Sequence, residues 1–317
     1  MVINGSALTS AQQLARIRHR HLNCFLAIAR TRKISLAAVA LNITQPAASK
    51  TLKELEELLD ARLFDRAGRG GLTLTPAGSL FLRHAGASVA ALKEGLDGLA
   101  QAQQRMTPQL SIGALPTVST HVMPSVINEF RKSHSARIRL ITGPNVVMLD
   151  QLRLGDLDLV VGRLPRPELM DGLSFTHLYS EQLVFAVRPE HPLAGSAFDA
   201  SMLESLTVLM PTGDGIMRPV VDRFLIANGV GATPNAIEAR SPDFCRQYAL
   251  ESDAIWIISR GVVEHDIKMG TLTVLDIDTS DTRGAVGLTI KADSDPSPAL
   301  RLMMATVASV AKARVLE

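Results

Sequence analysis

A short stretch of the chain combines hydrogen-bonding side chains with little bulk. It reads TQPAASKTLKELE, from Thr44 to Glu56. Thr44 is a good N-cap, so Gln45 and Pro46 occupy the first helical turn, where the N–H that proline lacks would have no partner within the helix. Small side chains let the backbone approach a partner closely, and the free N–H groups at a helix start favour phosphate. The stretch predicts a helix whose leading end binds a polyanion.

Other polar residues lack the spacing of catalytic or metal sites. Asp156 and Asp158 lie two residues apart at the start of a predicted strand, so their side chains point to opposite faces and cannot share a substrate. The stretch PTGDGI lacks the lysine and the spacing of a phosphate loop, and no HExxH or GxSxG is present. Cys24 and Cys245 lie far apart, with no metal-ligand neighbour at motif spacing. We therefore expect no enzyme, no cofactor and no metal.

Two predicted helices precede the Thr44 stretch and complete a motif with it. Apolar residues at i, i+3, i+4 and i+7 predict a first helix from about Arg20 to Thr31, and Ser35 is expected to cap a second from Leu36 to about Leu41. Helix, short turn and helix with a small polar edge is the helix-turn-helix pattern, whose second helix enters the DNA major groove. Three packed helices that bind no nucleic acid are the alternative. The residues of these helices expected to contact DNA are Ser35, Thr44, Gln45, Pro46, Ser49, Lys50 and Lys53.

A predicted hairpin and a long helix follow. The stretch LFDRAGRGGLTLTPAG, residues 63–78, places Arg66 and Arg69 on a small hairpin, which would be a wing that contacts the DNA backbone or minor groove. Pro76 then starts a helix from Ala77 to about Gln104. Its apolar face is too sparse to be buried within its own domain, so we expect a partner helix from a second subunit. A solvated spacer is the alternative.

Charge separates this head from the rest of the chain. Residues 1–107 hold 14 Lys and Arg against 7 Asp and Glu, whereas the remaining 210 residues hold 19 against 24. A basic head on an acidic body is typical of a polyanion-binding module joined to a second domain. The chain has no run of 18 apolar residues that could span a membrane, and its first residues do not resemble a secretory signal, so we expect a cytoplasmic protein.

Residues 108–317 alternate short strand-like and helical stretches, which predicts an α/β domain with a mainly parallel sheet and a second lobe. Ligands of such sheets bind at loops after strand ends, where helix starts offer N–H groups. Hydroxyls, amides and one fixed cation in these loops describe a carboxylate pocket, although ordinary helix capping would also explain the hydroxyls. The expected effector-binding residues are Thr117, Val118, Ser119, Asn145, Thr212, Gly213, Gly215, Arg218 and Phe244.

These residues resemble a known family along the whole chain, the LysR-type transcriptional regulators. The matching residues of the head are Leu22, Phe25, Ala37, Ala38, Leu41, Gln45, Pro46, Ala47, Ser49, Leu55, Glu56, Leu63, Phe64, Arg66, Leu74, Thr75 and Gly78. Asp60 departs from the usual glycine, but it can adopt the left-handed conformation at modest cost.

The resemblance implies three parts. These are a winged helix-turn-helix over residues 18–77, a linker and dimerisation helix over 78–106, and an effector-binding domain over 108–317 with two lobes like those of periplasmic binding proteins. Lobe I would comprise residues 108–179 and 269–317 and lobe II residues 180–268, with crossings near Tyr179 and Lys268.

The resemblance also implies partners and a function. It implies a homodimer that assembles to a homotetramer, binds an interrupted palindrome in double-stranded DNA and acts with RNA polymerase. Stretches such as IGALPTVST and SDAIWIISRGVV resemble most closely the members that control protocatechuate breakdown, and less closely those that respond to sugars. This implies an activator whose inducer is a small carboxylate such as a carboxymuconate. A regulator of sugar uptake or metabolism genes, or a repressor that senses no ligand, is the alternative.

Overall fold

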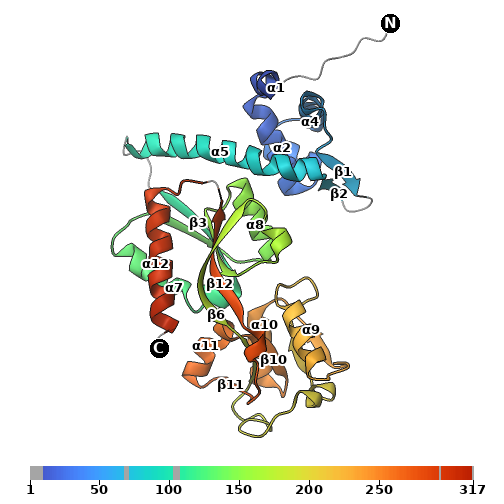
Figure 1. Cartoon of the computed structure of the whole chain (residues 1–317), viewed down its shortest axis with the longest axis vertical. Coiled ribbons are helices and arrows are strands. Elements are labelled where there is room, and N and C mark those ends of the chain that lie inside the picture. Colours follow the sequence, from blue (N-terminus) through green and yellow to red (C-terminus); the bar gives the residue numbers. More distant parts are fainter. Residues whose placement is uncertain (1–9, 68–70, 103–107, 293, 316–317) are drawn as a thin grey trace. The chain divides into compact units, whose positions relative to one another are not determined.

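The computed structural model describes residues 10–67, 71–102, 108–292 and 294–315. The chain forms two compact units: the first comprises residues 1–107 together with 150–157, and the second comprises residues 108–149 and 158–317 (Figure 1). Within the described ranges, no helix is long and apolar enough to cross a membrane.

The first unit is helical with a small hairpin. Its core is formed by apolar side chains of four helices, α2 to α5, and the hairpin, with the Phe25 ring 5.3 Å from the Phe64 ring and 5.2 Å from the Phe81 ring. A helix at the start of this unit, α1, is one that the sequence patterns did not predict. The elements are α1 (Ser10–Arg16), α2 (His19–Thr31), α3 (Ile34–Ala40), α4 (Gln45–Leu59), β1 (Phe64–Ala67), β2 (Gly71–Leu74) and α5 (Pro76–Ala102).

The ends of α4 follow the sequence prediction. The Thr44 hydroxyl accepts a hydrogen bond from the Ala47 N–H at 3.4 Å, and Pro46 lies in the first turn. Asp60 ends the helix in the left-handed conformation, with φ of 50°. The expected cap of the preceding helix was wrong: α3 begins at Ile34, so Ser35 lies inside its first turn. Lys33 is the N-cap there, with an extended backbone and without a side-chain hydrogen bond, because lysine has no oxygen that could accept one from the helix start.

The hairpin and α5 also occur where expected. β1 and β2 pair antiparallel with Arg66 opposite Leu72, whereas Arg69 lies outside the described residues. On α5 several leucines are exposed, which suits the expectation of a partner helix; the partner itself stays a prediction. The exposed fractions are 53% for Leu80, 52% for Leu92, 60% for Leu96 and 62% for Leu99.

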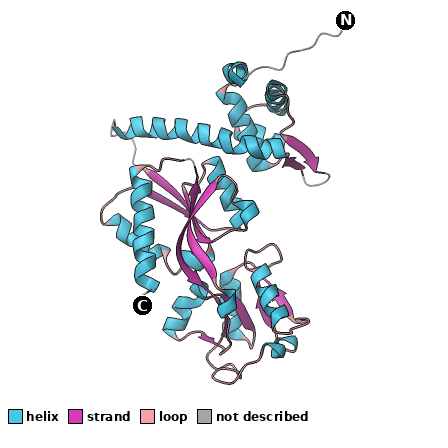
Figure 2. Cartoon of the chain, in the orientation of Figure 1, coloured by secondary structure: helices cyan, strands magenta, loops and turns pink. Residues whose placement is uncertain are grey.

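The second unit contains two five-stranded sheets, each with helices beside its strands (Figure 2). We call the first sheet and its helices lobe I. Its strand order is β4-β3-β5-β12-β6; β3 runs parallel to β4 and β5, and β12 is antiparallel to β5 and β6. α7 and α12 cover one face and α8 the other (Figure 1). Lobe I comprises β3 (Gln109–Ala114), α6 (Pro116–Ser119), α7 (Met123–Arg131), β4 (Arg137–Ile141), α8 (Asn145–Leu154), β5 (Leu159–Arg163), β6 (Leu173–Glu181), β12 (Gly284–Lys291) and α12 (Pro298–Val315).

Lobe II is built on the second sheet, with strand order β11-β7-β10-β8-β9. Two apolar clusters fill it, one around Phe185 and Phe224 and one around Trp256. Lobe II comprises β7 (Leu183–Val187), β8 (Val208–Met210), α9 (Arg218–Ala227), β9 (Ala236–Glu238), α10 (Pro242–Glu251), β10 (Ile255–Ser259), α11 (Arg260–Met269) and β11 (Thr273–Val274).

Two chain crossings join the lobes. The first lies at Gln182, between β6 and β7, close to the expected position near Tyr179. The second lies between β11 and β12. The expected position near Lys268 was wrong, because Lys268 is inside α11. The chain stays in lobe II as far as Val274, since β11 pairs with β7. The crossings are tied together because the Leu183 N–H donates to the Thr282 hydroxyl at 2.9 Å.

We expect Asp60→Gly to stabilise α4, because glycine adopts the left-handed conformation without the steric cost of a Cβ. The gain is about 1 kcal/mol, which slows local amide exchange roughly fivefold. Hydrogen exchange of peptides covering α4 would measure it. Asp60→Ala is the control and should speed exchange; a faster rate in the glycine variant as well would contradict the assignment.

We expect both cysteines to be inert in the native chain. Cys24 is 1% exposed and Cys245 is 3% exposed, and burial raises the pKa of the Cys245 thiol to about 11. Because the thiolate is the nucleophile, almost none reacts at about pH 8. Titration with a disulfide reagent such as Ellman's should detect no thiol in the native chain and both in guanidinium chloride. Rapid reaction of the native chain would show that these sites open.

Candidate functional site

The leading end of α4 presents its polar residues to solvent. Ala48, Leu52 and Leu55 are buried in the first unit, as their helical spacing predicts. The residues predicted to contact DNA lie on the remaining surface and are exposed: Thr44, Gln45, Pro46, Ser49, Lys50 and Lys53. Their cations are only lightly compensated, since Lys50 lies 4.0 Å from Glu54 and Lys53 lies 3.6 Å from Glu57 on this exposed face.

A cavity of about 330 Å³ lies beside this helix start, lined by Arg32, Lys33, Ile34, Ser35, Gln45, Gly71 and Leu72. The hairpin is fixed against it because the Leu72 N–H donates to the Arg32 carbonyl at 2.9 Å. Gly71 makes this approach possible: its φ is +98°, and a Cβ there would lie 2.7 Å from the same carbonyl oxygen. Basic side chains and a helix start around one cavity suit a phosphate of the DNA backbone.

The sequence patterns missed Arg32 and Lys33. They follow the end of α2, where the only available signal is that two cations stand next to a predicted helix-turn-helix. Ser35, which was predicted, lines the same cavity and is exposed.

In the second unit, loops after the parallel strands of lobe I bring polar groups to the side where the chain crosses to lobe II. Thr117 lies on α6 and is 5% exposed. Val118 is fully buried in the core of lobe I, which leaves only its backbone for a ligand, and Ser119 is half-buried. Asn145, at the start of α8, is 8% exposed, and neither its amide nitrogen nor its amide oxygen has a hydrogen-bond partner within the described part of the chain. Such a group calls for a partner that the protein does not supply.

A buried ion pair lies where the lobes meet. Arg163 ends β5 and Glu181 ends β6, and both side chains are 6% exposed. The Arg163 Nη2 donates to the Glu181 carbonyl at 2.6 Å, and its Nε lies 3.5 Å from Glu181 Oε1. The Glu181 carboxylate also accepts hydrogen bonds from the Thr117 hydroxyl in lobe I and, at 3.2 Å, from the Gly261 N–H at the start of α11 in lobe II.

Burial dominates the electrostatics of this pair. It raises the pKa of Glu181, an effect opposed by the Thr117 hydroxyl, the Arg163 charge and the Gly261 N–H. It likewise lowers the pKa of Arg163, against the attraction of Glu181. Burial thus opposes the charged form of both side chains, and a buried pair of this kind often contributes little to stability.

The loop after β8 in lobe II carries the other predicted residues. The Thr212 hydroxyl donates to Asp214 at 2.8 Å, Gly213 is exposed, and the Gly215 N–H closes a turn on the Thr212 carbonyl. Phe244, on α10, is 47% exposed, with its ring 5.8 Å from that of Tyr248.

Arg218 differs from the fixed, available cation that the sequence suggested. Its guanidinium donates to Asp222 at 2.7 Å, to Glu238 at 2.5 Å and to the Pro211 carbonyl at 3.2 Å. Hydrogen bonds to Glu238 and Asp222 accordingly raise its pKa. Two carboxylates already compensate this charge, so the cation buried between the lobes is Arg163, which the sequence patterns did not single out.

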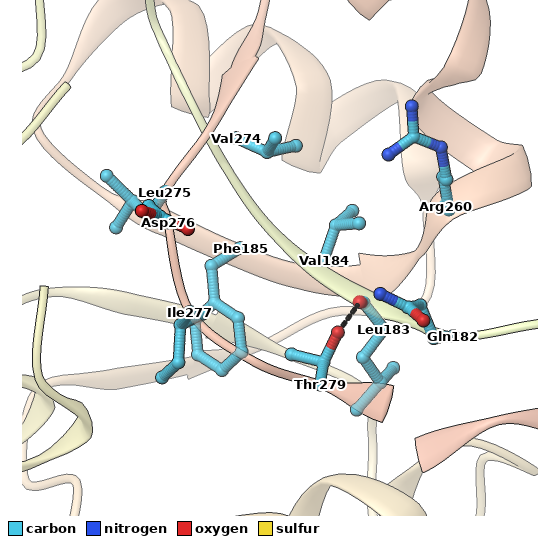
Figure 3. A pocket seen from close by; sticks show the side chains of 10 residues that line it. All are labelled: Gln182, Leu183, Val184, Phe185, Arg260, Val274, Leu275, Asp276, Ile277 and Thr279. Carbon is cyan, nitrogen blue, oxygen red and sulfur yellow. Dashed lines mark hydrogen bonds between the residues drawn. The ribbon is translucent and has the colours of Figure 1, made fainter. Parts of the chain in front are cut away.

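A second cavity, of about 250 Å³, lies in lobe II where the chain after β11 diverges from β7 (Figure 3). Its walls mix apolar and polar side chains, with Gln182 and Arg260 together at one end and the Thr279 hydroxyl donating to the Leu183 carbonyl. Arg260 is bonded to Glu264 at 2.9 Å. Within the described residues, no group of His, Cys, Asp and Glu side chains could hold a metal ion.

Comparison with known proteins accounts for both units. Residues 19–79 match the bacterial regulatory helix-turn-helix proteins of the lysR family, and residues 103–312 match the LysR substrate binding domain. The chain is 47% identical over 300 residues to the HTH-type transcriptional regulator PcaQ of Agrobacterium fabrum, covering 93% of this chain and 96% of that protein. It is 35% identical to the HTH-type regulator YdcI of Escherichia coli K12, covering 91% and 94%.

Among solved structures, ArgP from Mycobacterium tuberculosis matches with a TM-score of 0.67 at 16% identity, covering 93% of this chain and 98% of that one, which shows the shared fold. The family matches extend over both units, and the regulators of this family are DNA-binding proteins that respond to small effectors and are not enzymes. The chain thus belongs to the LysR family of transcriptional regulators.

Proposed function

We propose that this regulator activates genes for protocatechuate breakdown when it binds a small carboxylate such as a carboxymuconate. The observation that carries the proposal is the 47% identity to PcaQ, a regulator of the pca operon, along nearly the whole length of both chains. A likeness of this extent includes the DNA-binding unit and the ligand-binding unit together, so it favours both a similar target and a similar inducer.

The contacts in the second unit support a polar ligand of modest size. The Asn145 amide is buried without a partner among the described residues, and Thr117 and Ser119 lie on α6, which follows the strand β3 next to β4. Sugar sites commonly use stacking aromatic rings, but Trp256 is 2% exposed and packs inside lobe II. These features favour the carboxylate over the sugar alternative.

The DNA-binding unit supports a division of roles. Gln45, Pro46, Ser49 and Lys50 at the leading end of α4 would contact base edges, and Arg66 on β1 would contact the backbone, as would Arg69, which lies outside the described residues. Exposed leucines of α5 would join two subunits, and two such dimers would form the tetramer on an interrupted palindrome. We place this activity in the cytoplasm, together with the RNA polymerase that an activator would recruit.

We expect Gln45→Ala to weaken binding to the operator selectively, because glutamine can form two hydrogen bonds with adenine in the major groove. The loss should be about 1–3 kcal/mol on the operator and close to zero on random DNA. Titration of labelled DNA at fixed salt measures both. Gln247→Ala, an exposed glutamine on α10, is the matched control and should change neither affinity. An equal loss on both DNAs would argue against base recognition.

Thermal unfolding of the full chain tests the inducer. With carboxymuconate, muconate, protocatechuate and simple sugars compared in turn, we expect the carboxylated muconates to raise the Tm. At a hundred times its dissociation constant a ligand stabilises the folded state by about 2.7 kcal/mol, a shift of a few degrees.

Asn145→Ala should abolish this shift, whereas Asn228→Ala, at the end of α9, should retain it. A shift with sugars, or with none of these compounds, would refute the pathway proposal and leave the family assignment intact.

A further inference from the structure

A side chain of the protein itself fills a carboxylate-shaped site between the lobes. Three groups from different elements converge on the Glu181 carboxylate: the Thr117 hydroxyl of α6, the Gly261 N–H of α11 and, 3.5 Å away, the Arg163 Nε of β5. A hydroxyl, a helix-start N–H and a guanidinium are the usual partners of a bound carboxylate. Because the donors come from both lobes, the carboxylate joins them.

The surrounding backbone is shaped around these groups. A Cβ at Gly261 would lie 2.5 Å from the Thr117 carbonyl oxygen and 2.8 Å from Glu181 Oε2. A Cβ at Gly284 would lie 3.0 Å from the Arg163 Nη1. Glycine at both positions is what allows the hydroxyl, the carboxylate and the guanidinium to occupy the same small space.

Glu181 does not fully satisfy the site. The Arg163 Nη1 points at the Met217 thioether, 3.1 Å away, which is a weak acceptor, and the Nε has no hydrogen-bond partner among the described residues. A guanidinium that is 6% exposed retains donors that a second carboxylate oxygen, better oriented, could accept.

Stability does not explain this arrangement. Replacing a buried ion pair by apolar side chains is often neutral or stabilising, so a chain that needed only a firm joint between its lobes could use an apolar contact. A charged site that can exchange one carboxylate for another is of use to a protein that senses carboxylates.

We propose that Glu181 is a built-in occupant of a carboxylate-binding site formed by Thr117, Arg163 and the Gly261 N–H, and that a free carboxylate binds there by displacing it. The identity of that carboxylate as the inducer rests on the proposed function; the site itself does not. In the unliganded protein, the Glu181 carboxylate connects α6 and α11 through its hydrogen bonds to Thr117 and Gly261. When a ligand displaces Glu181, the ligand forms this connection instead, so binding changes how α6 and α11 are held together.

Chemical rescue tests the site without knowledge of the inducer. Glu181→Ala removes a CH₂–COO⁻ group, which acetate closely matches in size and charge. We expect sodium acetate to raise the Tm of the full-length variant by about 2 °C or more over sodium chloride of equal ionic strength. The wild type should show a smaller rise at the same acetate concentration, because acetate must first displace the tethered Glu181 carboxylate.

Two controls separate the site from general effects. Asp253→Ala removes a carboxylate that also pairs with an arginine, Arg188 at 2.7 Å, but is half exposed, so acetate should not rescue it. Acetamide, which has the shape of acetate without its charge, should not rescue Glu181→Ala. Equal shifts in all three proteins, equal shifts with acetamide, or no shift in the Glu181 variant would overturn the proposal.

If Glu181→Ala does not fold, Glu181→Ser vacates the same space and keeps a partner for Thr117, and the same outcomes apply. The result is independent of the inducer panel. Rescue by acetate with no response of the wild type to muconates would support this site and refute the pathway. A response of the wild type to muconates without rescue of the Glu181 variant by acetate would support the pathway and refute this site.

Discussion

Everything in the second unit depends on how two separate sheets are held by two crossings of the chain. The pairing of β6 with β12 ends at Glu181 and Gly284. In lobe II, the pairing of β7 starts at Leu183 and that of β11 ends at Val274. The backbone of the two crossings therefore forms few hydrogen bonds to neighbouring strands. Side chains take over that role: Thr279 and Thr282 bond the Leu183 backbone, and Glu181 reaches Thr117 and Gly261. The junction is therefore built from polar contacts that can be exchanged, rather than from an apolar core that must be repacked.

The same dependence explains why a buried ion pair is tolerated. Desolvation shifts the pKa of Glu181 upward and that of Arg163 downward, in each case against the influence of the partner. Each ion can remain charged only while the other stays in place, because an unpaired buried charge is far more costly than the pair. A ligand that brings its own negative charge avoids this cost, whereas a neutral ligand does not, so the junction itself discriminates in favour of anions.

Local patterns predicted much of the first unit, because its signals lie within a few residues of one another. Thr44 as cap, Pro46 in the first turn and the stripe through Ala48, Leu52 and Leu55 depend on spacing alone. Ser35 failed as a cap because α3 already begins at Ile34, so Ser35 lies inside the helix and the local pattern placed the helix start too late. In the second unit the decisive contacts are long-range: Arg163 and Glu181 are 18 residues apart and meet only through the register of β5, β12 and β6. The spacing of Arg218 and Asp222, four residues apart on a helix, could have predicted their ion pair. The second partner, Glu238, could not be predicted in this way, because it lies near Arg218 only through the pairing of β8 with β9.

The DNA-binding site at α4 and the carboxylate site at α11 both use the free N–H groups at the start of a helix. They differ in the source of the anion that these groups bind. At α4 the residues around the start are small, exposed and basic, so the negative charge must come from outside the chain, as DNA provides it. At α11 the chain provides a carboxylate of its own, placed by β6 and shielded from water. An external anion at α4 meets only counterions as competitors, and its affinity therefore falls with salt. An external carboxylate at α11 competes with Glu181, a tethered group at high effective concentration, so it must bind Arg163 better than Glu181 does. The incompletely bonded guanidinium leaves room for that difference.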